Sequence, residues 1–314
     1  MNIKIRNSFL LMIAALIWGT AFVAQSEGAE AIGPYAFNCI RSFVGTGALC
    51  IVILIMDKLG ISKKPATKEE KRLLLKGGIS CGIVLFVAGN LQQVGLYYGT
   101  SAGKAGFLTA CYILLVPIIG LFLKKKCGWN IWIGVGLTLV GLYLLCMSGS
   151  FSLQFSDGLV LICALFFAIH ILVVDYYSPK VDGVRLSCIQ FAVCALLGLI
   201  PTSCVDIGLS AEKFLDWLPL LASWEAWISL LFAGVMSSGV AFTLQIIAQN
   251  GLNPTVASLI MSLESVFAVL AGWLILHERM TGREIVGCVL IFGAIVLAQL
   301  PVGHLLRNRK VLEK

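Results

Sequence analysis

Residues 15–19, Ala-Leu-Ile-Trp-Gly, return 149 residues later as Ala-Leu-Phe-Phe-Ala at 164–168. At the same offset, Cys-Ile-Arg at 39–41 returns as Cys-Ile-Gln at 188–190. Both echoes lie in apolar runs long enough to cross a bilayer, and the offset between the copies spans an odd number of such runs. The second copy therefore inserts upside down relative to the first. Inverted repeats inside a polytopic membrane protein are typical of secondary transporters.

Composition places most of the chain in lipid, because 59% of the 314 residues are hydrophobic and only 12% are charged. About 20 apolar residues cross a ~30 Å hydrocarbon core, and backbone in that core has to be helical. We therefore predict an all-α polytopic membrane protein whose ten transmembrane helices form two inverted five-helix repeats, at 1–149 and 150–314. The ten apolar runs lie near residues 8–26, 34–56, 77–98, 105–123, 130–148, 158–178, 186–204, 224–248, 254–276 and 285–303.

The net charge of +7 is distributed unevenly. With the N-terminus inside, 18 of the 23 lysines and arginines fall on one side, four fall on the other, and Arg41 lies within a helix. The positive-inside rule then places both termini, including a short basic C-terminal tail, in the cytoplasm, and the protein in the cell membrane. Membrane lipids, not nucleic acid, are the expected partner of this charge. The basic stretch 57–76 is expected to be a solvated surface loop.

Catalytic and cofactor motifs are missing from the sequence. It contains no GxxxxGK[ST], HExxH or GxSxG pattern, and its 11 cysteines fall singly without the spacing of a metal site. We therefore expect no enzyme and no cofactor. The energy for transport is expected to come from a solute gradient, a proton gradient or exchange.

Several residues resemble an EamA-type domain in their order and spacing. Two such domains in tandem make up ten-helix exporters of the drug/metabolite transporter superfamily, and residues 93–109 are especially similar to one bacterial branch. The resemblance covers the whole chain and implies a membrane carrier, frequently an exporter of amino acids or related metabolites. One departure is Ser265, where the family often has proline. The residues that carry the resemblance are Trp18, Gly19, Phe22, Pro34, Arg41, Pro117, Leu263, Glu264, Leu276, Glu278 and Gly287.

Three ionisable side chains, Arg41, His170 and Glu264, lie well away from the ends of the apolar runs. A charged side chain costs roughly 2.5–3.5 kcal/mol at the helix centre. Glu264 lies close to the predicted midplane. It is expected to be a proton-coupling carboxylate, a counter-charge for a substrate ammonium, or a protonated acid bonded to a neighbouring helix. Arg41 either attracts a substrate carboxylate or snorkels to the outer headgroups. His170 either joins a proton relay or is a neutral hydrogen-bonding residue.

Amides and aromatics form the rest of the candidate substrate site. Asn90 and Gln93 share a face of one helix with Tyr97 further on, and Gln245 lies on the eighth apolar run. Amides suit a zwitterion, because they both donate and accept, but they also join helices. Four further aromatics are expected either to wall a cavity or to pack: Trp18, Phe22, Phe107 and Tyr112.

These observations predict a secondary transporter that moves a small metabolite, an amino acid or related zwitterion, outward by alternating access. Protons are a candidate coupling ion. The alternatives are a cationic-drug or sugar-type carrier of the same fold and, from other classes, an intramembrane enzyme or a scaffold.

Overall fold

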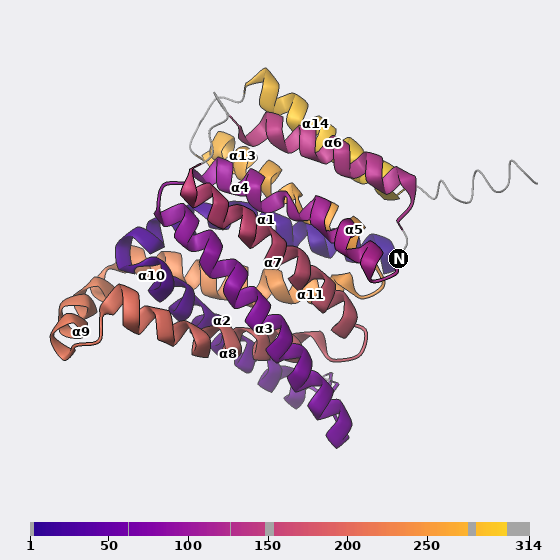
Figure 1. Ribbon diagram of the computed structural model, residues 1–314. Coiled ribbons are helices and arrows are strands. Elements are labelled where there is room, and N and C mark those ends of the chain that lie inside the picture. Colours follow the sequence, from indigo (N-terminus) through magenta and orange to yellow (C-terminus); the bar gives the residue numbers. More distant parts are fainter. Residues whose placement is uncertain (1–2, 62, 126, 148–153, 276–280, 300–314) are drawn as a thin grey trace, which may run out of the picture.

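The computed structural model describes residues 3–61, 63–125, 127–147, 154–275 and 281–299 of the chain (Figure 1). Within these ranges every regular element is a helix and none is a strand. The elements are α1 (Ile3–Ile32), α2 (Pro34–Lys58), α3 (Lys68–Tyr97), α4 (Ala102–Ala110), α5 (Tyr112–Phe122), α6 (Trp129–Cys146), α7 (Phe155–Tyr177), α8 (Gly183–Pro201), η1 (Thr202–Ile207), α9 (Ala211–Trp217), η2 (Leu218–Ala222), α10 (Trp224–Leu231), η3 (Phe232–Ala241), α11 (Phe242–Gln249), α12 (Pro254–Met261), α13 (Leu263–Ile275) and α14 (Gly282–Gln299).

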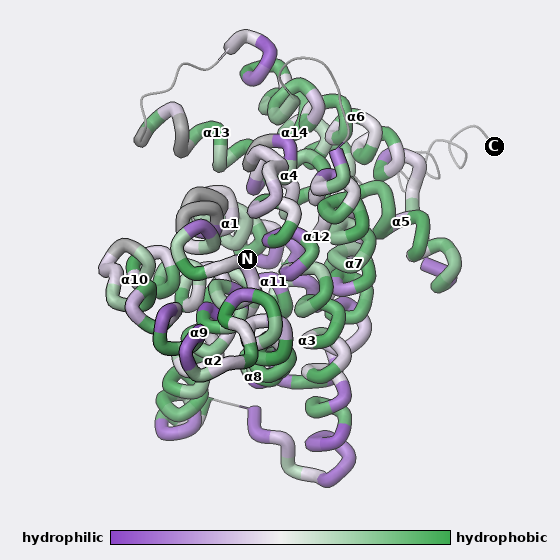
Figure 2. Tube along the Cα trace, turned by 60° about the vertical axis from the view of Figure 1, so that its left-hand side comes forward, coloured by the Kyte–Doolittle hydropathy of each residue, from purple (hydrophilic) through white to green (hydrophobic). Residues whose placement is uncertain are grey.

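Nine helical stretches in the described part of the chain are long and apolar enough to cross a membrane, and Pro254–Leu270 is a tenth, shorter one. The prediction of an all-α polytopic membrane protein is thereby confirmed. Figure 2 shows where polar and apolar residues lie along the trace: hydrophobic residues line the helices, and hydrophilic residues gather mainly at loops and helix ends.

The loop predicted at 57–76 is shorter than expected, because α2 continues to Lys58 and α3 already begins at Lys68. α3 begins at Lys68 because Thr67 and Glu70 form a capping box. The Thr67 hydroxyl accepts the Glu70 N–H at 3.1 Å, and the Glu70 carboxylate accepts the Thr67 N–H at 3.3 Å. These reciprocal bonds satisfy two donors that a helix start leaves free, which extends α3 beyond its apolar run.

Neighbouring helices come in matched pairs. α2 packs on α8 and α6 packs on α14 (Figure 1), and each pair joins two spans that are five spans apart in the chain. α3 packs on α7 and α8, just as the span α10–η3–α11 packs on α1 and α2. α4 and α5 pack on α7, just as α12 and α13 pack on α1. Two five-helix units related by a two-fold axis give this pattern.

Two spans are interrupted at corresponding places. One helix ends at Ala110 and the next begins at Tyr112, with Cys111 between them, and Ser262 similarly separates α12 from α13. The Cys111 N–H bonds back to the third preceding residue at 3.2 Å, and the Ser265 N–H does the same at 3.3 Å, which tightens each helix locally. Sequence analysis placed one continuous apolar run over each of these spans, near residues 105–123 and 254–276.

One end of the bundle collects the start of α1 and the loops after α2, α5, α7 and α11, and we call it the basic end. Arg185 at the start of α8 donates from Nη2 to Asp57 Oδ1 at the end of α2, at 2.5 Å. The Asn7 amide of α1 donates to the Asn250 carbonyl at 2.6 Å. Loops that the charge bias assigns to one side of the membrane therefore lie together.

The opposite end, which we call the far end, is joined by contacts of its own. Buried Asp157 of α7 accepts the Thr100 hydroxyl at 3.0 Å and forms an ion pair with Lys104 of α4. Trp217 of α9 donates from its indole N–H to the Ile32 carbonyl at 2.9 Å, which holds the loop after η1 against the end of α1.

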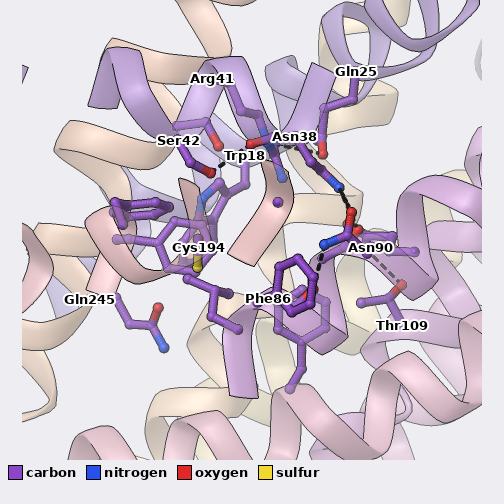
Figure 3. Close-up of a pocket in the computed structure, with 18 of the residues that line it drawn as sticks. Trp18, Gln25, Asn38, Arg41, Ser42, Phe86, Asn90, Thr109, Cys194 and Gln245 are labelled. Carbon is purple, nitrogen blue, oxygen red and sulfur yellow. Dashed lines mark hydrogen bonds between the residues drawn. The ribbon is translucent and has the colours of Figure 1, made fainter. Parts of the chain in front are cut away.

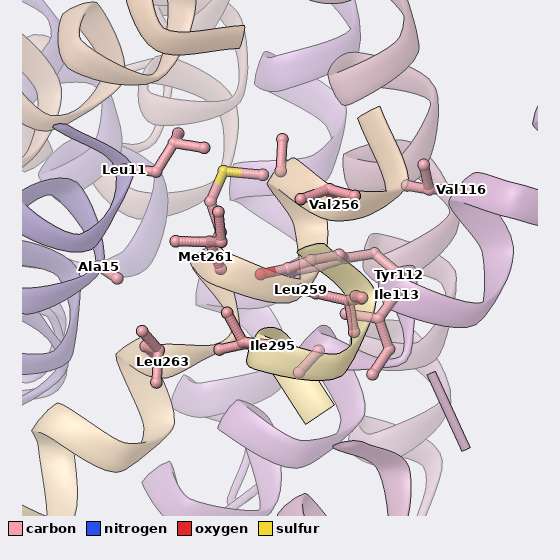
Figure 4. Packing of buried hydrophobic residues seen from close by; sticks show 14 of the residues in the cluster. Leu11, Ala15, Tyr112, Ile113, Val116, Val256, Leu259, Met261, Leu263 and Ile295 are labelled. Carbon is pink, nitrogen blue, oxygen red and sulfur yellow. The ribbon is translucent and has the colours of Figure 1, made fainter. Parts of the chain in front are cut away.

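The largest apolar core (Figure 4) joins Leu11 and Ala15 of α1, Val116 of α5, and Val256 and Leu259 of α12. All five side chains are buried and lie in the part of their spans nearer the basic end. The same core also includes residues of α6 near the far end. Dense packing of the five residues fills the interior near the basic end.

Candidate functional site

A cavity lies inside the bundle, lined by residues of α1, α2, α3, α4, α5, α7, α8, η3, α11, α12 and α13 (Figure 3). The volume that the centre of a water-sized sphere can occupy in this cavity is ≈ 80 Å³. By the same measure one water needs ~10–15 Å³, so the cavity is several times larger than a single water requires. It is lined by both polar and aromatic side chains. The residues with polar side-chain atoms are Trp18, Gln25, Asn38, Arg41, Ser42, Asn90, Gln92, Thr109, Tyr112, Ser237, Gln245 and Glu264.

Six residues expected at the site line this one cavity, although they are spread over six elements. They are Trp18 of α1, Arg41 of α2, Asn90 of α3, Tyr112 of α5, Gln245 of α11 and Glu264 of α13. Phe22 lies outside the residues whose side chains the structure describes.

Four other expected residues lie away from the cavity lining. Gln93 is fully buried behind it, where its Nε2 donates to the backbone carbonyl of Gln25 at 2.8 Å. Tyr97 is 47% exposed at the end of α3. Phe107 packs against the apolar core, with its ring centroid 6.1 Å from that of Tyr143.

His170 also lies behind the lining. It is buried, and its Nε2 forms a 2.9 Å hydrogen bond with Oε1 of Gln190. Its ring meets the edge of Phe242, with centroids 6.0 Å apart. In this position histidine joins α7 to α8, as the hydrogen-bonding alternative expected.

Arg41 points inward, toward α1 and α3, which argues against snorkelling to the headgroups (Figure 3). Its Nη1 donates to Oε1 of Gln25 at 3.0 Å, and its guanidinium carbon lies 5.8 Å from the ring centroid of Phe37. Among the described residues no carboxylate lies within 4.0 Å of its nitrogens. A buried cation normally has an acidic partner, so a guanidinium without one inside a cavity is a candidate anion site.

Glu264 lines the cavity from another helix and is only 7% exposed. The interruption at Ser262 places it in the first turn of α13, where the free N–H groups and the helix dipole favour negative charge. Close packing fixes this turn, because a Cβ at Gly19 of α1 would lie 2.5 Å from the Glu264 carbonyl oxygen. In the described ranges no basic side chain lies within 4.0 Å of its carboxylate.

Aromatic rings form the wall of the cavity toward the basic end. Phe242 of α11 is at their centre, with its ring 4.8 Å from that of Trp18 and 5.4 Å from that of Phe191, both edge-on. All three line the cavity. Such edge-to-face packing gives a rigid apolar wall with exposed π faces, on which an apolar group or a cation can rest.

Three polar atoms of the lining have no hydrogen-bond partner among the described residues. They are the indole N–H of Trp18, Oδ1 of Asn38 and Oε1 of Gln245. Since buried polar groups are nearly always paired, one donor and two acceptors remain available to water or a solute.

Sequence analysis missed Gln25, Asn38 and Phe242 of the lining. Asn38 precedes Arg41 by three residues and so shares its helical face, a spacing that could have identified it. Nothing in the sequence distinguishes Phe242 from the other phenylalanines.

Comparison with known proteins points to one family. The sequence profile of the EamA-like transporter family matches residues 6–147 and again 154–300. An uncharacterized transporter of Archaeoglobus fulgidus is 31% identical over 297 residues, covering 93% of this chain and 85% of the relative. The uncharacterized transporter YoaV of Bacillus subtilis is 28% identical over 296 residues, covering 91% of this chain and 94% of YoaV. A solved crystal structure superposes with a TM-score of 0.74 at 16% identity, covering 96% of this chain and 98% of the other, which shows the shared fold.

Proposed function

The chain belongs to the EamA-like transporter family, and on that premise we propose that it carries a small zwitterionic metabolite, an amino acid or a close relative, outward across the cell membrane. The repeats at 1–149 and 150–314 are the two moving units, and the basic end faces the cytoplasm. The relatives are named as transporters, in keeping with a chain that has no catalytic step.

The observation that carries this proposal is the pair of opposite charges in the cavity. Arg41 and Glu264 both line it, yet neither forms an ion pair with the other or with another described residue. A zwitterion brings one group for each of them. Asn38, Asn90 and Gln245 add amide groups, which can both donate hydrogen bonds to a carboxylate and accept them from an ammonium group.

Alternating access is supported by where the interior is filled. Leu11 and Val256, near the ends of α1 and α12 that lie at the basic end, are buried in the largest apolar core, and Tyr112 and Met261 of the same core line the cavity. The matched packing of the two halves provides a mirrored arrangement in which the opposite half would close. Movement of one repeat against the other then exposes the cavity to each side in turn.

A cationic-drug carrier is the second candidate, and one observation favours it. Glu264 and the π faces of Trp18 and Phe242 line the same cavity, and carboxylates and aromatic faces both attract organic cations. Under this alternative Arg41 would repel the substrate. A sugar-type carrier would instead use the amides and neither charge.

A growth screen separates these candidates. Cells expressing the protein are challenged with toxic amino acid analogues and, in parallel, with cationic dyes. We expect protection against one or more analogues and none against the dyes, because export lowers the internal concentration. Protection against dyes alone would favour the cationic alternative. The matched control is Gly136→Ala, since a Cβ at Gly136 meets nothing within 4 Å.

A further inference from the structure

Gly89 differs from the other glycines of α3. A Cβ at Gly77, Gly78, Gly82 or Gly95 would come within 2.4 to 2.9 Å of an atom of α7 or α8, so those glycines permit close helix packing. A Cβ at Gly89 would meet nothing nearer than Nη2 of Arg41, at 3.9 Å. The missing side chain at Gly89 therefore leaves open space in front of the guanidinium.

The surroundings keep this space suited to an anion. The carbonyl oxygen of Gly89 accepts a hydrogen bond from Nδ2 of Asn38 at 3.0 Å, so it is already paired and does not need the guanidinium. The same amide lies 3.2 Å from Oδ1 of Asn90. Arg41 itself has one hydrogen bond, through Nη1 to Gln25. Its Nη2 is the one atom that borders the space left at Gly89, since it alone lies within 4 Å of a Cβ placed there.

The corresponding corner of the second half is filled. The offsets of the repeat align Arg41 with Gln190 and Gly89 with Phe242. Gln190 is bonded to His170 at 2.9 Å, and the Phe242 ring packs on its aromatic neighbours. The first repeat thus has the Arg41 guanidinium beside the open space at Gly89, whereas the second repeat has the Gln190 amide and the Phe242 ring at the corresponding positions.

We propose that Arg41 and the space left by Gly89 form a carboxylate subsite, in which the planar guanidinium binds the substrate carboxylate through two parallel N–H···O bonds. The inference rests on the proposed function and deepens it, because it assigns the anionic end of the zwitterion to α2 and α3. Glu264, on α13, then faces the ammonium end.

The test measures ligand binding to purified full-length protein in lipid nanodiscs. Four probes share one side chain: an amino acid, its deaminated carboxylic acid, its amide and its decarboxylated amine. The set is repeated with the side chains of alanine, leucine and phenylalanine. Arg41→Gln removes the charge, Arg41→Lys keeps it without the fork, and Gly89→Val fills the space. Gly136→Val is the matched control, because it adds the same bulk to a helix where a Cβ meets nothing within 4 Å.

We expect carboxylate-bearing probes to bind about 10- to 100-fold more tightly than their amides, the range that charge-assisted hydrogen bonds give. Arg41→Gln and Gly89→Val should abolish this preference, Arg41→Lys should reduce it, and Gly136→Val should leave it intact. If Gly89→Val does not yield monodisperse protein, the two Arg41 variants decide the outcome.

The remaining outcomes separate the subsite from the transported class. Amino acids that bind with unchanged preference after Arg41→Gln would overturn the carboxylate subsite and leave the zwitterion carrier in place. Carboxylic acids that bind as tightly as amino acids would support the subsite but contradict a zwitterionic substrate. Binding of the amines alone, or of no probe, would contradict both.

Discussion

Gly19→Ala tests the contact that positions Glu264. The new Cβ would lie 2.5 Å from the Glu264 carbonyl oxygen, 2.9 Å from the Ala268 nitrogen and 2.9 Å from the Phe267 Cβ. Two of these are backbone atoms, which cannot rotate away. Ordinary contact begins near 3.4 Å, so α1 and α13 would have to separate by about 0.9 Å.

Overpacking of this kind costs about 1–3 kcal/mol. For a chain of this length the melting temperature Tm should fall by about 2–5 °C, as measured by thermal unfolding of purified protein in detergent. Transport should fall as well, because the shift moves the turn that carries Glu264 relative to the aromatic wall at Trp18.

Gly136→Ala is the control for this measurement. It lies on a helix surface where a Cβ meets nothing within 4 Å, and alanine forms helix better than glycine by roughly 0.5–1 kcal/mol. Its Tm should be unchanged or slightly raised. If Gly19→Ala behaves like Gly136→Ala, then α1 and α13 are not in contact as described, and the placement of Glu264 in the cavity is wrong.

Three further predictions concern the lining, the coupling and the topology. Asn90→Leu should impair transport in a proteoliposome assay while the protein stays monodisperse, because Asn90 lines the cavity. Gln93→Leu should instead lower Tm, because Gln93 joins α3 to α1. Glu264→Gln should insert normally but lose accumulation driven by a pH gradient, since the amide cannot carry a proton, and its exchange should be weakened, since the amide has no charge for the ammonium. Unchanged accumulation and exchange would leave Glu264 a structural role. A reporter fused after Lys64 should report the cytoplasm and one within 206–216 the outside, and the same location for both would contradict the assigned topology.

The spans were predictable from the sequence, whereas the interruptions within two of them were not. Long apolar runs identify helices because lipid leaves the backbone no alternative. The breaks at Cys111 and Ser262 follow from tertiary packing, with no glycine or proline at either position to reveal them. Pro117 lies further along α5, beyond the break.

The candidate site was predictable in its chemistry and less so in its geometry. Gln92 and Gln93 are adjacent, but successive helical residues point about 100° apart, so Gln92 lines the cavity and Gln93 bonds to α1. Tyr97 shares the face of Gln93 and is likewise absent from the lining. The rotation of α3 about its axis decides which amide meets a solute, and packing against α7 and α8 sets that rotation.

Counterflow by purified protein in proteoliposomes tests the central claim most directly. Liposomes loaded with an unlabelled amino acid are placed in the same labelled amino acid, and uptake of label is followed. We predict saturable counterflow that is lost in Arg41→Gln, weakened in Glu264→Gln and retained in Gly136→Ala. Counterflow of cationic dyes but of no amino acid, or amino acid counterflow that Arg41→Gln leaves unchanged, would contradict a zwitterion carrier that uses this cavity.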